Sequence, residues 1–171
     1  MYLLTKNLDK MKKYKWIIIG FNLILVLFLF NKSIFEKEKI LNEGKLVLLR
    51  LAPVDPRSLM QGDYMRLNYE ISSSIPSDSI SKRGYCIIRL DKDGIGTKVR
   101  LQNDIKPINE GEYAVVYTAS NWWINIGAES YFFEEGKAEK YDSAKYGGMK
   151  IDNHGNNILV GLYDGNLKKI E

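Results

Sequence analysis

The chain has 171 residues, a length that favours one folded domain with an appendage, and a formal net charge of +4 with a sequence pI near 9.0. The charge is unevenly distributed, because residues 1–35 hold six lysines and one acidic residue, whereas residues 36–171 hold 19 basic and 20 acidic residues. The basic excess therefore belongs to the N-terminal flank, and we predict no nucleic-acid partner.

Residues 16–30 form an uncharged apolar run with one polar side chain, Asn22. At about 1.5 Å per residue this run is shorter than the roughly 20 residues that cross a bilayer, and residues 14, 15 and 31–35 supply the missing length. The following Asn-Lys-Ser-Ile-Phe-Glu is bulky and charged, unlike a signal-peptide cleavage site. We therefore predict a transmembrane signal anchor over residues 14–35, with a cleaved signal peptide as the rival interpretation.

Lysines are distributed asymmetrically around this span. Five precede the apolar run at 16–30, whereas the residues after the run mix lysines with glutamates. The positive-inside rule predicts a single-pass protein of the cytoplasmic (inner) membrane, with residues 1–13 as a basic cytoplasmic N-terminus and the C-terminal domain outside the cytoplasm. Residues 36–44 are predicted to form a helical stalk, since good helix formers end at Gly44. One helix is thus expected from about Lys13 to Glu43.

Beyond Gly44 the hydrophobic period becomes typical of strands. Residues 64–71 alternate apolar with polar side chains, and Asp91-Lys92-Asp93-Gly94 is a strong hairpin signal. Strands are predicted over residues 45–51, 64–71, 84–90, 97–101, 112–119, 122–126, 149–152 and 157–163, with a short polar helix within 134–146. Residues 45–171 are therefore predicted to be an extracytoplasmic, mainly β domain, a small antiparallel β barrel or sandwich with one short helix. An α+β fold is the alternative.

Residues 62–69 read Gly-Asp-Tyr-Met-Arg-Leu-Asn-Tyr, and this pattern resembles the bacterial membrane-anchored GDYXXLXY protein family. The Asp-Pro-Arg-Ser-Leu block at 55–59 and the Glu38, Leu41 and Gly44 spacing before it are similar to the family pattern. Residues 130–138 and 159–165 resemble two further family elements, whereas Gln61 stands where the family typically has Arg or Lys. Family members are often encoded beside, or joined to, multi-spanning membrane proteins. The resemblance therefore implies a membrane-protein partner.

The segment around this motif supplies candidate binding residues, because two carboxylates and two guanidinium groups within twelve residues are able to hold a polar or anionic ligand. The structural interpretation, which we favour, assigns them to a turn in which Arg57 pairs with Asp63 and Gly62 takes a positive φ. The ligand- or partner-binding candidates are Asp55, Arg57, Asp63, Arg66, Glu134 and Trp122. The structural motif comprises Pro56, Gly62, Tyr64, Leu67, Tyr69 and Gly136.

Ser58 is the candidate nucleophile of an alternative function, a membrane-tethered serine hydrolase or peptidase. Signal peptidases place a serine shortly before a Gly-Asp in outward-facing β domains, but the spacing from Ser58 to Gly62 is shorter than theirs and no lysine stands in a general-base motif. We therefore favour a non-enzymatic envelope protein whose β domain binds a membrane protein or an envelope component.

The remaining chemistry-bearing residues are few. Cys86 is the single cysteine and is predicted to be a buried apolar side chain. With one histidine and one cysteine in the chain, we predict no metal site and no cofactor. Core packing is predicted for Trp123 and Phe132, which would leave Trp122 exposed.

Overall fold

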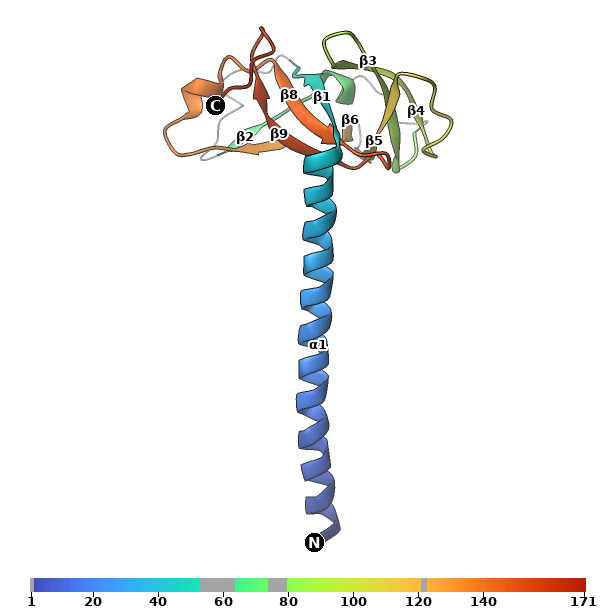
Figure 1. Ribbon diagram of the computed structural model, residues 1–171, viewed down its shortest axis with the longest axis vertical. Helices are drawn as coiled ribbons and strands as arrows, with labels where there is room; N and C mark the ends of the chain where they lie inside the picture. Colours follow the sequence, from blue (N-terminus) through green and yellow to red (C-terminus); the bar gives the residue numbers. More distant parts are fainter. Residues whose placement is uncertain (1, 53–63, 74–79, 121–122) are drawn as a thin grey trace. The chain divides into compact units, whose positions relative to one another are not determined.

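This computed structural model describes residues 2–52, 64–73, 80–120 and 123–171. The chain divides into two compact units, one ending at Lys39 and the other running from Ile40 to Glu171 (Figure 1). The elements in chain order are α1 (Tyr2–Glu43), β1 (Lys45–Arg50), β2 (Tyr64–Arg66), the 3₁₀ turn η1 (Glu70–Ser72), β3 (Arg83–Leu90), β4 (Ile95–Gln102), β5 (Glu112–Ser120), β6 (Trp123–Asn125), β7 (Ser130–Phe132), the 3₁₀ turn η3 (Ala138–Tyr141), β8 (Tyr146–Ile151) and β9 (Asn157–Tyr163).

The helix α1 is longer at its start than the sequence analysis predicted. It begins at Tyr2 rather than near Lys13, because residues 2–13 contain no glycine or proline to stop a helix that is already nucleated by the apolar run. It ends at Glu43, as predicted, where the Gly44 amide donates to the Ile40 carbonyl at 2.9 Å. A Cβ on Gly44 would collide with that carbonyl oxygen, so glycine permits the chain to turn from helix into β1.

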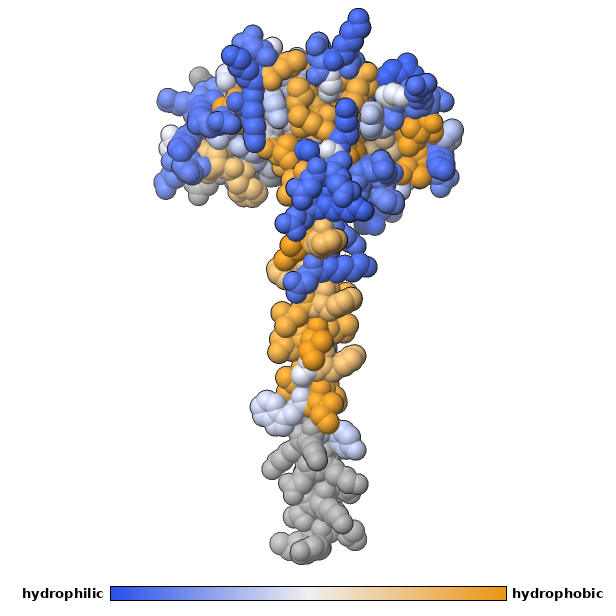
Figure 2. Space-filling view, viewed as in Figure 1, coloured by the Kyte–Doolittle hydropathy of each residue, from blue (hydrophilic) through white to orange (hydrophobic). Residues whose placement is uncertain are grey.

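The middle of α1 is apolar on all sides. Every large apolar side chain from Trp16 to Phe30 is more than two-fifths exposed. The face of the helix seen in Figure 2 carries hydrophobic side chains along much of its length. By length and composition α1 contains one candidate membrane span, found within Tyr14–Glu43, and none of its most apolar window is buried against protein. The helix is compatible with a single membrane anchor.

The second unit is built on a curled seven-stranded sheet in the order β6-β5-β3-β4-β1-β8-β9 (Figure 1). Neighbouring strands are antiparallel with one exception, the short parallel pairing of β1 with β4 through Leu48↔Ile95 and Leu49↔Gly96. β1 lies inside the sheet, and its consecutive Val47, Leu48 and Leu49 are all buried, as expected for a strand covered on both faces. A separate two-stranded ribbon pairs β2 with β7.

The mainly β fold class is confirmed, and two local predictions change. Residues 64–71 form a strand only over Tyr64–Arg66 and then pass into η1, although the predicted alternation of buried and exposed side chains holds throughout. The polar helix expected within 134–146 is the single turn η3, because Tyr146 already pairs in β8. The parallel β1–β4 pairing was not predicted, since the pairing partner of a buried strand is set by the sheet and not by its own residues.

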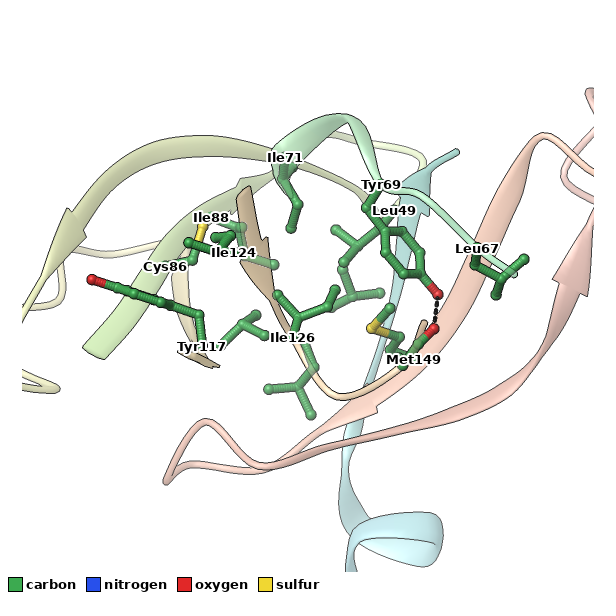
Figure 3. Close-up of a cluster of buried hydrophobic side chains, with 14 of the residues drawn as sticks. Leu49, Leu67, Tyr69, Ile71, Cys86, Ile88, Tyr117, Ile124, Ile126 and Met149 are labelled. Atoms are coloured by element: carbon green, nitrogen blue, oxygen red, sulfur yellow. Dashed lines mark hydrogen bonds between the residues drawn. The ribbon is translucent and has the colours of Figure 1, made fainter. Parts of the chain in front are cut away.

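The hydrophobic core fills the concave side of the sheet. Figure 3 shows Leu49 and Met149 from β1 and β8, with Tyr69 and Ile71 from the segment after β2, meeting Ile124 and Ile126. The further fully or nearly buried members of the cluster are Val47, Met65, Leu67, Cys86, Ile88, Val115, Tyr117, Ala128, Tyr141, Ile151 and Leu162. The segment that follows β2 therefore closes this side of the sheet.

Candidate partner-binding surface

Seven of the thirteen candidate residues lie outside the part of the chain that the structure describes. They are Asp55, Pro56, Arg57, Ser58, Gly62, Asp63 and Trp122. The Arg57–Asp63 pair and the Ser58 nucleophile accordingly stay predictions. The motif residues that the structure does describe divide into a buried group and an exposed group.

Leu67 and Tyr69 form the buried group, each about 1% exposed. The Tyr69 hydroxyl donates to the Ala128 carbonyl at 2.7 Å, which ties the segment after β2 to the loop between β6 and β7 (Figure 3). A Cβ on Gly147 of β8 would lie 2.8 Å from two atoms of Tyr69, so a glycine there lets the tyrosine pack on the strand. Burial raises the pKa of Tyr69, and the negative charge of Glu129 adds to this effect. The Tyr69 hydroxyl therefore stays protonated and acts as a neutral donor.

Tyr64 and Arg66 form the exposed group, on one face of the β2–β7 ribbon. Tyr64 lies opposite Phe132 and Arg66 opposite Ser130, and all four residues are exposed. We call these four residues the outward ribbon face. The Tyr64 and Phe132 ring centroids are 5.8 Å apart at an interplanar angle of 40°, and the Phe132 side chain is 73% exposed. Met65 and Tyr131 occupy the opposite face and pack against the core.

The prediction that Trp123 and Phe132 are core residues is wrong. Trp123 is 47% exposed and Phe132 is 73% exposed, because the alternation in β6 and β7 directs Ile124 and Tyr131 inward. The inward aromatic rings are instead Tyr131 and Phe133, which contact Tyr141 of η3 edge-on and at a tilt, with centroids 5.2 and 5.3 Å away.

The sequence of the chain matches a known family. A sequence profile described as the GDYXXLXY protein matches residues 26–162, from the second half of the apolar helix into β9. The chain belongs to the GDYXXLXY protein family. Neither the curated proteins nor the solved structures compared with the chain include a significant match.

The GDYxxLxY motif thus combines two structural tasks in this chain. Its Leu67 and Tyr69 are core residues, whereas its Tyr64 lies on the outward ribbon face. A motif tyrosine in van der Waals reach of an exposed phenylalanine is the kind of rigid, amphipathic surface that protein partners bind. Within the described part of the motif, Leu67 and Tyr69 thus contribute to the core and Tyr64 to the exposed surface.

Glu134 and Gly136 lie just after β7, in the second element of the GDYXXLXY resemblance. Glu134 forms an ion pair with Lys137, which lowers the pKa of the glutamate, and its side chain is 76% exposed. Gly136 has φ of 79°, a left-handed conformation that favours glycine, and it precedes η3. The ion pair and the glycine turn therefore belong to the turn that leads from β7 into η3.

The sequence analysis missed a buried carboxylate, that of Glu112, on the face of the sheet that lies away from the core. Glu112 begins β5, and its side chain is fully buried between Arg89 of β3 and Arg100 of β4. Arg100 Nη1 donates to both carboxylate oxygens at 3.0 and 2.9 Å, and Arg89 Nη2 donates to Oε1 at 3.1 Å. The Asn109 amide donates to Oε2 at 3.1 Å and its side-chain Nδ2 to Oε1 at 3.3 Å.

These contacts attach the loop between β4 and β5 to the sheet. They also lower the pKa of Glu112 to about 2, although burial opposes this shift. The backbone hydrogen bond from Asn109 is the largest cause, and the side-chain hydrogen bonds from Arg100, Asn109 and Arg89 add to it. Arg100 Nη2 also donates to the Pro107 carbonyl at 2.8 Å. All polar capacity of the carboxylate is used internally, which indicates a structural group. The sequence carries no signal for it, because its partners come from three separate segments.

Cys86 is buried, as predicted, on the core face of β3. Burial raises the pKa of its thiol to about 12, only partly offset by Lys98, so the nucleophilic thiolate is scarce at neutral pH. Among the residues that the structure describes, no three histidine, cysteine, aspartate or glutamate side chains group as metal ligands.

Proposed function

We propose that this GDYXXLXY protein is a single-pass membrane protein whose β domain lies outside the cytoplasm and binds a membrane-protein partner or an envelope component. The observation that carries the proposal is the apolar stretch Trp16–Phe30 of α1, whose large side chains are all exposed. A helix that is apolar on every side is stable only when lipid or protein surrounds it. The second unit has a hydrophobic core of its own.

Orientation rests on the lysines. Lys6, Lys10, Lys12, Lys13 and Lys15 precede the apolar stretch, and Lys32 on its other side is followed by Glu36 at i+4. Cytoplasmic flanks of short loops carry the excess of basic residues. This asymmetry supports a cytoplasmic N-terminus and an outward β domain in the inner membrane, with α1 as an uncleaved signal anchor.

A reporter that is active only outside the cytoplasm tests this orientation. Fused after Glu171, it is expected to be active, because five lysines hold the N-terminus inside. Exchanging Lys12, Lys13 and Lys15 for glutamine while adding three lysines to residues 31–39 should reduce or invert the signal. Exchanging Lys137, Lys140 and Lys145 of the β domain for glutamine is the matched control and should leave it unchanged, since charges far from the span do not set topology. Cytoplasmic activity of the unaltered fusion would contradict the proposal.

Partner binding is supported by the outward ribbon face. Its Tyr64 and Phe132 present two adjacent aromatic rings, flanked by Arg66, and aromatic and arginine side chains are enriched where proteins meet. Isolated exposed apolar residues are ordinary on protein surfaces, whereas a paired aromatic patch beside a guanidinium is a recognisable contact site. We assign the partner contact to this face.

Combined Tyr64→Ala and Phe132→Ala substitutions are expected to abolish the partner contact. Crosslinking in intact membranes, followed by purification of the full chain, should recover a multi-spanning membrane protein with the unaltered protein. The double variant should recover at least tenfold less of it, since truncating two central aromatic residues commonly costs about 2 kcal/mol or more of binding free energy. Ile108→Ala is the control, because Ile108 has the same 38% exposure as Tyr64 and lies on the loop before β5. Equal recovery of the partner with the double variant and with Ile108→Ala would contradict the assignment of the contact to the outward ribbon face.

A further inference from the structure

Asn22 is the one polar side chain within the apolar stretch of α1, and it is exposed. Its Nδ2 donates to the Ile18 carbonyl at 3.1 Å. Among the described residues this is its single hydrogen bond, so the second amide hydrogen and the Oδ1 acceptor have no partner there. At about 1.5 Å per residue, Asn22 lies roughly 4 Å from the middle of the proposed 14–35 span. Water does not reach this depth to satisfy the amide.

Asn31 provides an internal comparison. Its Nδ2 also bonds back to a carbonyl, that of Leu27 at 2.8 Å. It lies near the end of the span, however, beside Lys32, where headgroups and water supply further hydrogen bonds. An asparagine side chain therefore costs little free energy at position 31. At position 22 it costs more, unless a second helix completes its hydrogen bonds.

The neighbours of Asn22 define a seam along the helix. Ile18, Leu25 and Leu29 stand at −4, +3 and +7 from it, so the four residues occupy successive a and d positions of a heptad with Asn22 at a. All four side chains are exposed in the single chain. This spacing keeps one stripe facing a partner helix over two heptads.

We propose that α1 pairs in the membrane with α1 of a second copy of this chain, as a parallel dimer in which Asn22 faces Asn22. The proposal rests on the membrane span of the proposed function and goes beyond it. All copies are inserted with the same orientation, so the two helices run parallel and a twofold axis places equal a positions opposite each other. A carboxamide carries both a donor and an acceptor, and Oδ1 of one copy accepts from the free Nδ2 hydrogen of the other. One asparagine at an a position specifies two strands and their register.

Energy transfer between donor- and acceptor-labelled full-length protein in phosphatidylcholine vesicles tests the pairing. The unaltered chain should transfer energy in linear proportion to the acceptor fraction, as a dimer does. Asn22→Leu is expected to weaken the dimer about tenfold when lipid dilutes it, because the interhelical hydrogen bonds are lost. Asn31→Leu, off the seam, should behave as the unaltered chain, and Asn22→Gln should retain association because it keeps donor and acceptor. Equal transfer by Asn22→Leu and the unaltered chain would overturn the proposal.

Disulfide trapping gives an independent readout of the seam. Leu25→Cys is expected to form covalent dimers on oxidation, whereas Leu27→Cys, the same change on the opposite side of the helix, should not. Cys86 is buried and contributes little background. Equal trapping at both positions would contradict the seam. Release of the full chain from membranes by alkaline carbonate would overturn the membrane span and this pairing together, whereas a chain that stays in the membrane as a monomer overturns the pairing alone.

Discussion

Replacing Tyr69 by alanine is expected to destabilise the β domain by about 3–5 kcal/mol, the range for removing a buried aromatic ring. The ring is about 1% exposed and packs against Gly147, so its loss leaves a cavity between the segment after β2 and β8. The hydroxyl has a separable role, since it is the donor for the Ala128 carbonyl. Tyr69→Phe keeps the ring and removes only this bond, so it should cost about 1–3 kcal/mol by leaving the carbonyl unpaired.

Urea unfolding of residues 38–171, which retain the buried Ile40, is the appropriate measurement. Tyr64→Phe is the matched control, because it makes the same change in the same motif at a ring that is 38% exposed. It should alter the free energy of unfolding by no more than about 0.5 kcal/mol. A Tyr69→Phe domain as stable as the unaltered one would show that the Tyr69–Ala128 bond does not hold the segment after β2.

Glu112→Gln is expected to lower stability at pH 7 and to flatten its dependence on acid. The folded state holds the pKa of Glu112 at about 2, below its ordinary value of about 4.3. Between these values the unfolded chain binds more protons than the folded one, so the unaltered domain loses stability as pH falls from about 4.3 towards 2. The amide of the variant does not titrate and leaves Arg89 and Arg100 without their shared anion.

Unfolding free energies of the unaltered domain and the variant, measured from pH 7 down to pH 2, should therefore converge in acid. Glu110→Gln is the control, since it makes the same change two residues earlier at an exposed position and should follow the unaltered domain throughout. Parallel curves for Glu112→Gln and the unaltered domain below pH 4.3 would contradict the assigned charge network.

Local patterns were sufficient for some features of this protein. The uncharged run at 16–30 and the helix stop at Gly44 identified the helix and its end, because length, hydropathy and chain breaking are properties of the segment itself. The alternation over residues 64–71 correctly identified Met65, Leu67, Tyr69 and Ile71 as buried, although most of the segment is not a strand. An extended chain exposes alternate side chains to the core whether or not it pairs with a neighbour.

Long-range contacts decided the rest. The parallel pairing of β1 with β4 and the inward turn of Tyr131 rather than Phe132 depend on which strand lies beside which, and in what register. Glu112 gained its two arginines only because β3, β4 and β5 are adjacent in the sheet. The hydrophobic pattern of residues 64–71 identified the side chains that this segment buries, whereas the burial of Glu112 and Tyr131 depends on which segments meet, because contact between distant residues is a property of the whole packed sheet.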